Sequence, residues 1–465
     1  MKQVLLAIVS AMLATTGAMA QGTMTFTTAA PQGTAVRILA NVVSSTQPIT
    51  IDFGNGVEQK FTIDPDQAAW QRWIDGTIEG STITVSGQVT EFQLQEAQLT
   101  SAELDGMSNL TKLDLSKNSL TSFELLTLTP LTSINLSYNN IQNSPATNPT
   151  LSLENCGKTL EWLTLNNNTG LQCLDVQYQT ALKYLTLNDC PDLASIFICL
   201  PESSQATLTS INLSNCSLSN FYPVSLPSLR TLNLSNNRLM TEGTDNPFVL
   251  GDYPELTTLS VSQNKAVHTL DVTKCTKLED LFINDCNFEL IDVSQAPALR
   301  TLNVANNTIR SLDLGNNTSI STLNVSGNPM TTLDVAKLPS ISSLNISNTQ
   351  ISRVDLMEAY FLKSFNASNT LLEFVDFNGL QANRVDRIDL RNCPNFTPES
   401  MNYTLRTVPV AKTSYGEQPN LLIEGSNGEH ADTSYPTSSD FQWICDVQGD
   451  GTATNSPVAV TLEGA

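Results

Sequence analysis

The stretch Leu299-Arg-Thr-Leu302-Asn-Val304 decides the fold, because its pattern returns three more times at constant steps. The later copies are Ile320-Ser-Thr-Leu323-Asn-Val325, Ile341-Ser-Ser-Leu344-Asn-Ile346 and Leu362-Lys-Ser-Phe365-Asn-Ala367. Successive copies begin 21 residues apart. A fixed period of this size predicts a solenoid in which each repeat forms one coil.

The spacing within one copy explains how a coil is built. Leu302 and Val304 are two residues apart, so in an extended segment both face one way while Asn303 faces the other. One coil cannot bury that apolar face alone, but coils stacked at about 4.8 Å form a parallel sheet over a continuous core. Asn307 follows where the backbone leaves the strand, and its amide can satisfy backbone groups that the turn would bury.

The same pattern extends in both directions from this stretch. Fourteen coils are expected, beginning at Val89, Leu110, Leu131, Leu160, Leu182, Leu208, Leu229, Leu256, Leu278, Leu299, Ile320, Ile341, Leu362 and Val385. Some steps are longer than 21 or 22 residues. The extra residues, such as 142–150 and 241–251, are expected to form loops that leave the stack intact.

The order Leu302-Asn-Val304, Asn307 and Leu312-Asp-Leu314 resembles the leucine-rich repeats of secreted bacterial surface proteins. The resemblance is to those of the Bacteroidetes and, more distantly, to the internalins. It implies a β-rich solenoid of about fourteen coils of 21–22 residues, with parallel sheets and β cap domains at both ends. It also implies recognition of a ligand, without identifying that ligand.

The first residues have the features of a secretory signal. Lys2 precedes an apolar run over 4–14, and Ala18-Met19-Ala20 offers a cleavage site before Gln21. The run is too short to span a membrane, and no later stretch reaches 18 continuous apolar residues. We therefore expect residues 1–20 to be a signal peptide, and the protein to be exported to the cell surface or medium without a transmembrane segment.

Three further segments are expected. Residues 21–88 form an N-terminal β cap, in which strands around 49–53 and 57–61 are joined by the turn Asn55-Gly56. A metal-binding interpretation of 51–56 is less favoured than the cap. The solenoid covers 89–407. Residues 408–465 form a C-terminal β module, whose end soon after an apolar strand suggests that it is incomplete.

Composition limits the function classes. The chain has 23 Lys plus Arg against 45 Asp plus Glu, a formal net charge of −22 at pH 7, so nucleic acid is excluded as a favoured partner. His268 and His430 are the two histidines, and neither lies in a catalytic motif. Asp446 and Asp450 only partly match a calcium loop. We expect no enzyme activity, no cofactor and no metal.

Cysteine is used in a positional way. Four cysteines occupy the turn position that Asn307 holds in its coil: Cys190, Cys216, Cys286 and Cys393. A buried thiol can replace Asn there as a small hydrogen-bonding group. No role or disulfide state is assigned to Cys156, Cys173, Cys199, Cys275 and Cys445, and no Cys-x-x-Cys pair indicates zinc.

A column of aspartates is expected beside the second apolar pair of each coil. Its members recur every 21 residues: Asp271, Asp292, Asp313, Asp334, Asp355 and Asp376. In a second strand these carboxylates would point outward and repel each other. Two explanations stay open. Ca²⁺ could bridge neighbours, or, as we favour, each Asp accepts hydrogen bonds from nearby amides and hydroxyls, with Arg353 also within reach of Asp355.

The outward face of the first strands mostly carries Thr, Ser and Asn. The exceptions are Trp162 and Tyr184, at the same position in neighbouring coils, and Tyr138 near the exit of the preceding strand. Exposed aromatic side chains are typical of protein hot spots and of sugar platforms, although these could instead cover the loop at 142–150. We predict an exported recognition protein that binds a protein partner, or adheres to the surface of host or neighbouring cells, through the concave face. A carbohydrate-binding accessory module is the alternative, and a structural spacer is a third.

Overall fold

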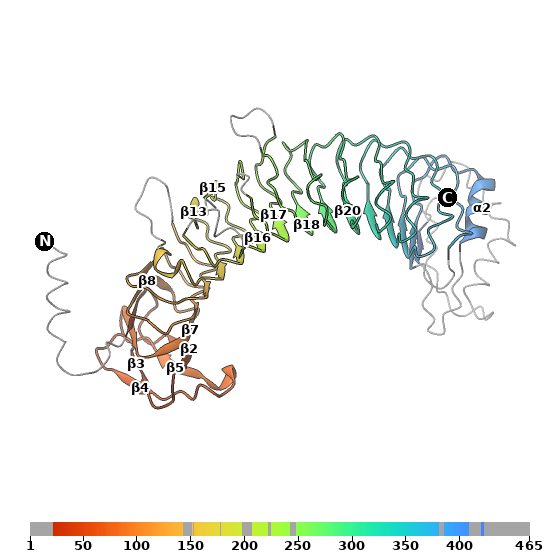
Figure 1. Ribbon diagram of the computed structural model, residues 1–465. Helices are drawn as coiled ribbons and strands as arrows, with labels where there is room; N and C mark the ends of the chain where they lie inside the picture. The colour runs from red at the N-terminus through yellow and green to blue at the C-terminus, as the bar shows by residue number, and fades with distance from the viewer. Residues whose placement is uncertain are drawn as a thin grey trace, which may run out of the picture. The chain divides into compact units, whose positions relative to one another are not determined.

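The computed structural model describes residues 22–142, 151, 153–176, 178–197, 207–221, 225–241, 248–380, 386–408 and 420–422. The chain divides into two compact units, Met1–Leu208 (unit 1) and Thr209–Ala465 (unit 2). Figure 1 colours unit 1 from red to yellow and unit 2 from green to blue. The N-terminal strands and the first coils lie in unit 1, and the regular coils lie in unit 2.

Unit 1 opens with two layers of strands. They are β1 (Thr23–Thr28), β2 (Ala35–Val42), β3 (Ile49–Asp52), β4 (Gln59–Phe61), β5 (Trp73–Thr77) and β6 (Thr82–Ser86), with a short 3-10 helix η1 (Ala69–Gln71) before β5. Strand β2 pairs antiparallel with β5, whereas β6 lies between β1 and β3. Phe26 of β1 stacks on Phe92 with ring centroids 5.5 Å apart, and both rings are buried between the layers.

The predicted N-terminal hairpin is confirmed. Strands β3 and β4 pair antiparallel, with Ile49 opposite Phe61. The Oδ1 atom of Asp52 accepts hydrogen bonds from the backbone amides of Gly54, Asn55 and Gly56. The carboxylate therefore holds the turn.

The first coil joins both layers. Its strands β7 (Val89–Leu94) and β8 (Leu99–Asp105) pair antiparallel with β2 and β1 respectively. The following first strands of unit 1 are β9 (Lys112–Asp114), β11 (Ser133–Asn135), β12 (Trp162–Thr164) and β14 (Tyr184–Thr186), which continue from β7 in parallel. Second strands are β10 (Ser122–Leu125), β13 (Cys173–Asp175) and β15 (Ser195–Phe197), and η2 (Glu154–Cys156) is a 3-10 helix.

Nine three-residue strands line one edge of unit 2 in Figure 1. They are β16 (Ser210–Asn212), β17 (Thr231–Asn233), β18 (Thr258–Ser260), β19 (Asp280–Phe282), β20 (Thr301–Asn303), β21 (Thr322–Asn324), β22 (Ser343–Asn345), β23 (Ser364–Asn366) and β24 (Arg387–Asp389). Each pairs in parallel with the next, as β20 does with β21. Leu302 and Val304 are fully buried. Every one of the fourteen predicted coils has its strand, so the solenoid with parallel sheets is confirmed.

Three details differ from the sequence predictions. In unit 2 the described residues of the Asp column form no second strand, and a turn begins two residues after each of these aspartates. A helix, α2 (Pro398–Thr407), follows the last coil and was not predicted. Its Thr404 and Thr407 hydroxyls accept hydrogen bonds from the backbone amides of Val375 and Phe377.

Of the C-terminal module, strand β25 (Asn420–Leu422) pairs in parallel with β24. Most of 408–465 and of both predicted loops lies outside the described residues.

Candidate functional site

A ladder of asparagine side chains fixes the shape of the turn that ends each first strand. The Nδ2 atom of Asn307 donates to the carbonyl oxygens of Val304 (2.9 Å) and, in the preceding coil, Ile283 (2.8 Å). Its Oδ1 accepts the backbone amide of Phe288 at 3.0 Å. One side chain thus satisfies buried backbone groups of two coils, as predicted. The other members are Asn118, Asn139, Asn168, Asn237, Asn264 and Asn328.

The four cysteines predicted for this ladder occupy it. The Sγ atoms of Cys190, Cys286 and Cys393 donate to carbonyl oxygens of the preceding coil at 3.2–3.4 Å. That of Cys216 contacts the Ser214 carbonyl within its own turn. Burial raises the pKa of the Cys286 thiol to about 11, so it stays protonated and can donate.

Two threonines complete the ladder and escaped the sequence analysis. The hydroxyls of Thr349 and Thr370 donate at 2.7 Å to the carbonyl oxygens of Ile346 and Ala367, three residues earlier in each turn. Both follow Asn328 at 21-residue steps, so the period contained the signal. Cys199 and Cys445 lie outside the described residues.

Trp162 and Tyr184 form the aromatic pair predicted for the outward face of unit 1. They face each other across β12 and β14, and their rings stack with centroids 5.5 Å apart and an interplanar angle of 8°. Their exposed fractions are 42% and 41%. The backbone register alone brings them together, because parallel strands place equivalent residues side by side.

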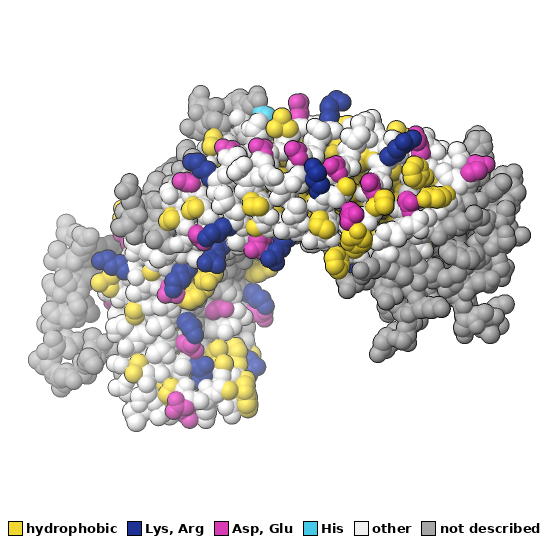
Figure 2. All heavy atoms as spheres, turned by 45° about the vertical axis from the view of Figure 1, so that its right-hand side comes forward, with side chains coloured by type: hydrophobic (Ala, Val, Ile, Leu, Met, Phe, Trp, Pro, Cys, Tyr) yellow, Lys and Arg dark blue, Asp and Glu magenta, His cyan; other side chains and the backbone are white. Residues whose placement is uncertain are grey.

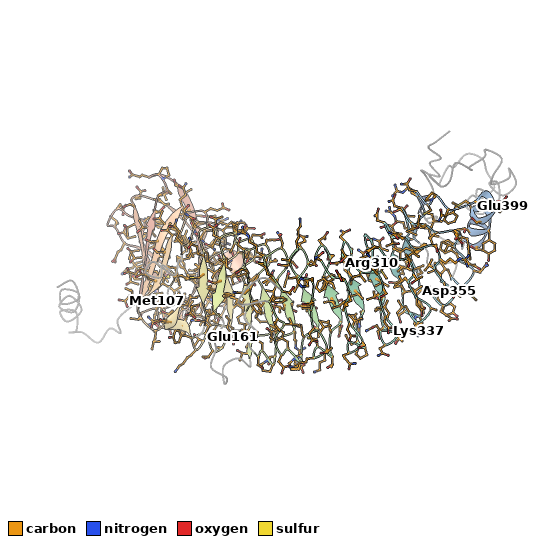
Figure 3. All side chains as sticks on the ribbon, turned by 90° about the horizontal axis from the view of Figure 1, so that it is seen from above. Met107, Glu161, Arg310, Lys337, Asp355 and Glu399 are labelled. Atoms are coloured by element: carbon orange, nitrogen blue, oxygen red, sulfur yellow. The ribbon has the colours of Figure 1, made fainter. Side chains whose placement is uncertain are left out.

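A charged pair beside the stack was missed from the sequence. The ammonium group of Lys183 lies 5.8 Å from the Trp162 ring centroid and 2.9 Å from Oε1 of Glu161. Both residues stand directly before an aromatic residue, where the two preceding coils have Thr111 and Thr132. Figure 3 labels Glu161 beside the strands of unit 1. The pair thus places a cationic group over the Trp162 ring and an anionic group beside that cation.

Tyr138 does not join the stack. Trp162 pairs with Ser133 of β11, and Tyr138 follows Ser133 by five residues. An extended segment of five residues spans about 16 Å. None of the ring contacts among the described residues includes it, and it is 57% exposed. Of the three predicted residues, Trp162 and Tyr184 therefore form a pair and Tyr138 stands apart from them.

Tyr138 has an unfavourable backbone conformation, with φ of 56°. All fourteen coils have a left-handed residue at this turn position, and ten of these residues are Asn, Asp or Gly, which adopt it most readily. The exceptions are Glu96, Lys117, Tyr138 and Gln263. A bulky residue there costs about 1 kcal/mol.

A charged cluster lies on the same sheet of unit 1. The Glu91 carboxylate of β7 forms ion pairs with Lys112 at 2.7 Å and with Arg72 at 3.2 Å. Burial raises the pKa of the Glu91 carboxyl, but the two cations outweigh it and hold that pKa below its usual value. The Glu91 side chain is 26% exposed, between the nearly buried Arg72 and the exposed Lys112.

The Asp column follows the hydrogen-bonding interpretation. In all six residues Oδ1 accepts the backbone amide two positions later, at 2.9–3.1 Å. The expected Arg353–Asp355 contact was wrong, because Arg353 instead binds Glu373 at 2.9 Å on the neighbouring coil. Figure 2 shows acidic side chains spaced along the coils of unit 2.

No metal-binding group of three His, Cys, Asp or Glu residues occurs among the described residues. His268 contacts the Thr241 hydroxyl through Nδ1 at 2.9 Å, whereas His430, Asp446 and Asp450 fall in the part of the chain that is not described. Within the described part, none of the helices has the length and apolar character needed to span a bilayer.

Comparisons with known proteins agree with this geometry. The family model "At1g61320/AtMIF1, LRR domain" matches residues 196–363, and a "Leucine Rich repeat" model matches residues 127–144. No curated protein matched the sequence.

Several solved structures are similar to the chain. The functional domain of InlJ from Listeria monocytogenes is 21% identical, with 75% of this chain and 77% of that one covered and a TM-score of 0.51. Internalin InlF from the same species is 19% identical, with 72% and 80% covered and a TM-score of 0.44. YopM from Yersinia pestis is 27% identical, with 61% and 84% covered and a TM-score of 0.40. The repeat matches, the coil register and the InlJ likeness together show that this chain is a leucine-rich-repeat solenoid with an internalin-like fold.

Proposed function

We propose that this protein is an exported recognition protein that binds a protein partner through the concave, outward face of the first-strand sheet in unit 1. Leucine-rich-repeat solenoids commonly mediate protein recognition and are typically not enzymes. The observation that carries the proposal is the exposed stack of Trp162 and Tyr184. Tyr138 would extend the contact at the rim of the same face.

The chemistry of the stack suits a protein interface. Two rings held parallel by adjacent strands offer a large apolar area at low entropic cost, because their rotamers are already fixed. Lys183 and Glu161 add one donor and one acceptor at the edge. Aromatic anchors with charged neighbours are the typical composition of an interface hot spot.

A carbohydrate-binding function is the second candidate. The near-coplanar rings form a flat platform, which also suits the apolar face of a sugar ring. A glycan array distinguishes the two candidates, because only the second predicts a selective sugar ligand.

Export is proposed from residues 1–20, with their basic start, apolar run and Ala18-Met19-Ala20 site. N-terminal sequencing of protein from the medium and from isolated cell surfaces tests it. The expected first residue is Gln21. An intact Met1 in these fractions would contradict export by this route.

The binding site is tested by photo-crosslinking. Benzoylphenylalanine at Tyr138 preserves an aromatic side chain, and the same residue at Gln263 is a matched control, since both positions are exposed left-handed turns. We expect a defined crosslinked protein band from extracts of surrounding cells only with the Tyr138 derivative. Equal bands from both positions would indicate general adhesion.

The double substitution Trp162→Ser and Tyr184→Ser completes the test. It should abolish that crosslink while the melting temperature stays within a few degrees, since surface substitutions usually cost under about 0.5 kcal/mol each. A large loss of stability with the crosslink retained would assign the stack a purely structural role.

A further inference from the structure

A second surface, on unit 2, has the features of a docking groove and shares no residue with the aromatic pair. It measures about 340 Å³ and lies between the segment 248–250 and the coils that contain Asp271 and Asp292. Phe248 and Val272 form a buried floor, whereas Val249 and Leu290 are 53% and 70% exposed on the walls. Large aliphatic side chains this exposed beside an apolar groove mark a contact surface.

The rim of the groove is negatively charged in a fixed geometry. Oδ1 of Asp271 accepts the amide of Thr273, and Oδ1 of Asp292 accepts the amide of Ser294, both at 2.9 Å. No hydrogen bond among the described residues uses the Oδ2 atom of either aspartate. Each carboxylate is therefore oriented by the backbone and has one oxygen available to a ligand.

The two carboxylates are also close enough to interact. Hydrogen bonds from Thr273 and Ser294 lower the pKa of Asp271 and Asp292, while the charge of Asp271 acts in the opposite direction on Asp292. Lys274 favours the charged form of Asp271 without forming an ion pair with it. A cation placed between the two carboxylates would remove their repulsion.

We propose that this groove binds a peptide segment in which an arginine is flanked by large aliphatic side chains. The aliphatic groups contact Val249, Leu290 and the floor, and the guanidinium bridges the free oxygens of Asp271 and Asp292. Arginine suits the site better than lysine, because its planar fork presents paired donors to two acceptors on adjacent coils. The strongly acidic chain favours such a cationic partner at long range.

Fluorescence polarisation with the full chain tests the proposal. The probe is the fluorescein-labelled peptide Gly-Leu-Leu-Arg-Leu-Gly, and the control peptides carry Glu in place of Arg or Ser in place of every Leu. We expect binding of the first peptide and at least about tenfold weaker binding of both controls, equivalent to 1.4 kcal/mol. No binding of the first peptide up to millimolar concentration would overturn the proposal.

Matched variants separate the groove from general charge attraction. Asp271→Asn with Asp292→Asn removes two charges but keeps the amide-accepting oxygens. Asp334→Asn with Asp355→Asn removes the same charge from the same column away from the groove. The first pair should weaken peptide binding at least about tenfold, as should Leu290→Ser, and the second pair less than about twofold. Equal losses from both pairs would show attraction by net charge alone and overturn the proposal.

Discussion

The outward faces of the two units share one backbone pattern and differ in chemistry. At the first strand position unit 1 carries Glu91, Lys112, Ser133, Trp162 and Tyr184. At the same position unit 2 carries Ser or Thr in seven of nine strands, namely Ser210, Thr231, Thr258, Thr301, Thr322, Ser343 and Ser364, and Asp280 and Arg387 in the other two. The inward neighbours are apolar in both units. The core therefore sets the coil, and the outward position is left to vary with function.

The largest expected effect concerns a feature that the two units share. Asn307→Ala should lower the free energy of unfolding by roughly 1 to 3 kcal/mol, because it leaves buried backbone groups of two coils unpaired. Asn168→Ala in unit 1 should cost about the same, since Asn168 makes equivalent bonds and is fully buried. Asn307→Cys should cost less. Denaturant melts measure all three, and no loss for either alanine variant would show that its ladder position is not structural.

Ion pairs in the two units should differ in how much they contribute to stability. Glu91→Gln should destabilise unit 1 by about 1 kcal/mol at pH 7, because Arg72 and Lys112 lose their shared partner. Since the folded-state pKa of Glu91 is lowered, its contribution is complete above the unfolded value near 4.5 and is lost as the pH falls through the folded value.

The wild type and the Glu91→Gln variant should therefore converge in stability as the pH falls through the lowered pKa of Glu91. Glu255→Gln in unit 2 is the control, because its pair with Lys277 is solvent-exposed and should matter far less. Thermal melts from pH 7 to pH 3 decide it. A constant difference across that range would contradict the assigned role of Glu91.

Tyr138→Asn should stabilise the protein by about 0.5 to 1 kcal/mol, because Asn adopts the left-handed conformation more readily than Tyr. Gln263→Asn should give a similar gain in unit 2. Only the first substitution should weaken partner binding. Melting temperatures combined with partner binding, once the crosslinked protein is known, test the distinction. Unchanged binding by Tyr138→Asn would remove this residue from the proposed site.

The smallest expected effect is that of added Ca²⁺ on the aspartate column. Each aspartate of the column already accepts a backbone amide through Oδ1, so calorimetric titration of the chelated protein with Ca²⁺ should show no saturable heat. Saturable binding that disappears in the variant with Asp313→Asn and Asp334→Asn would support cation bridging instead.

The sequence was most informative wherever the 21-residue period determines the environment. The burial of Leu302, the hydrogen bonds of Asn307 and the thiol of Cys286 could all be predicted, because every coil repeats the same geometry. The stack of Trp162 on Tyr184 followed from the same register. For these residues, position in the repeat was sufficient.

Prediction failed where the repeat stops or where a side chain competes with the backbone. Helix α2 follows the last repeat, and its docking through Thr404 and Thr407 leaves no periodic signal. The expected second strand is absent from the described Asp column, where each carboxylate accepts the amide two residues later and a turn begins at that residue. Arg353 reaches across to Glu373 on the next coil, a contact that sequence proximity to Asp355 obscured.

The antiparallel pairing of β7 with β2 and of β8 with β1 has a consequence for self-association. We propose residues 21–88 as the cap of the solenoid. An uncovered first coil would present two rows of unpaired amides and carbonyls, a template onto which another chain could add strands without limit. Both rows are occupied here by strands that run the opposite way. Removing this segment should promote end-to-end polymerisation of the chain.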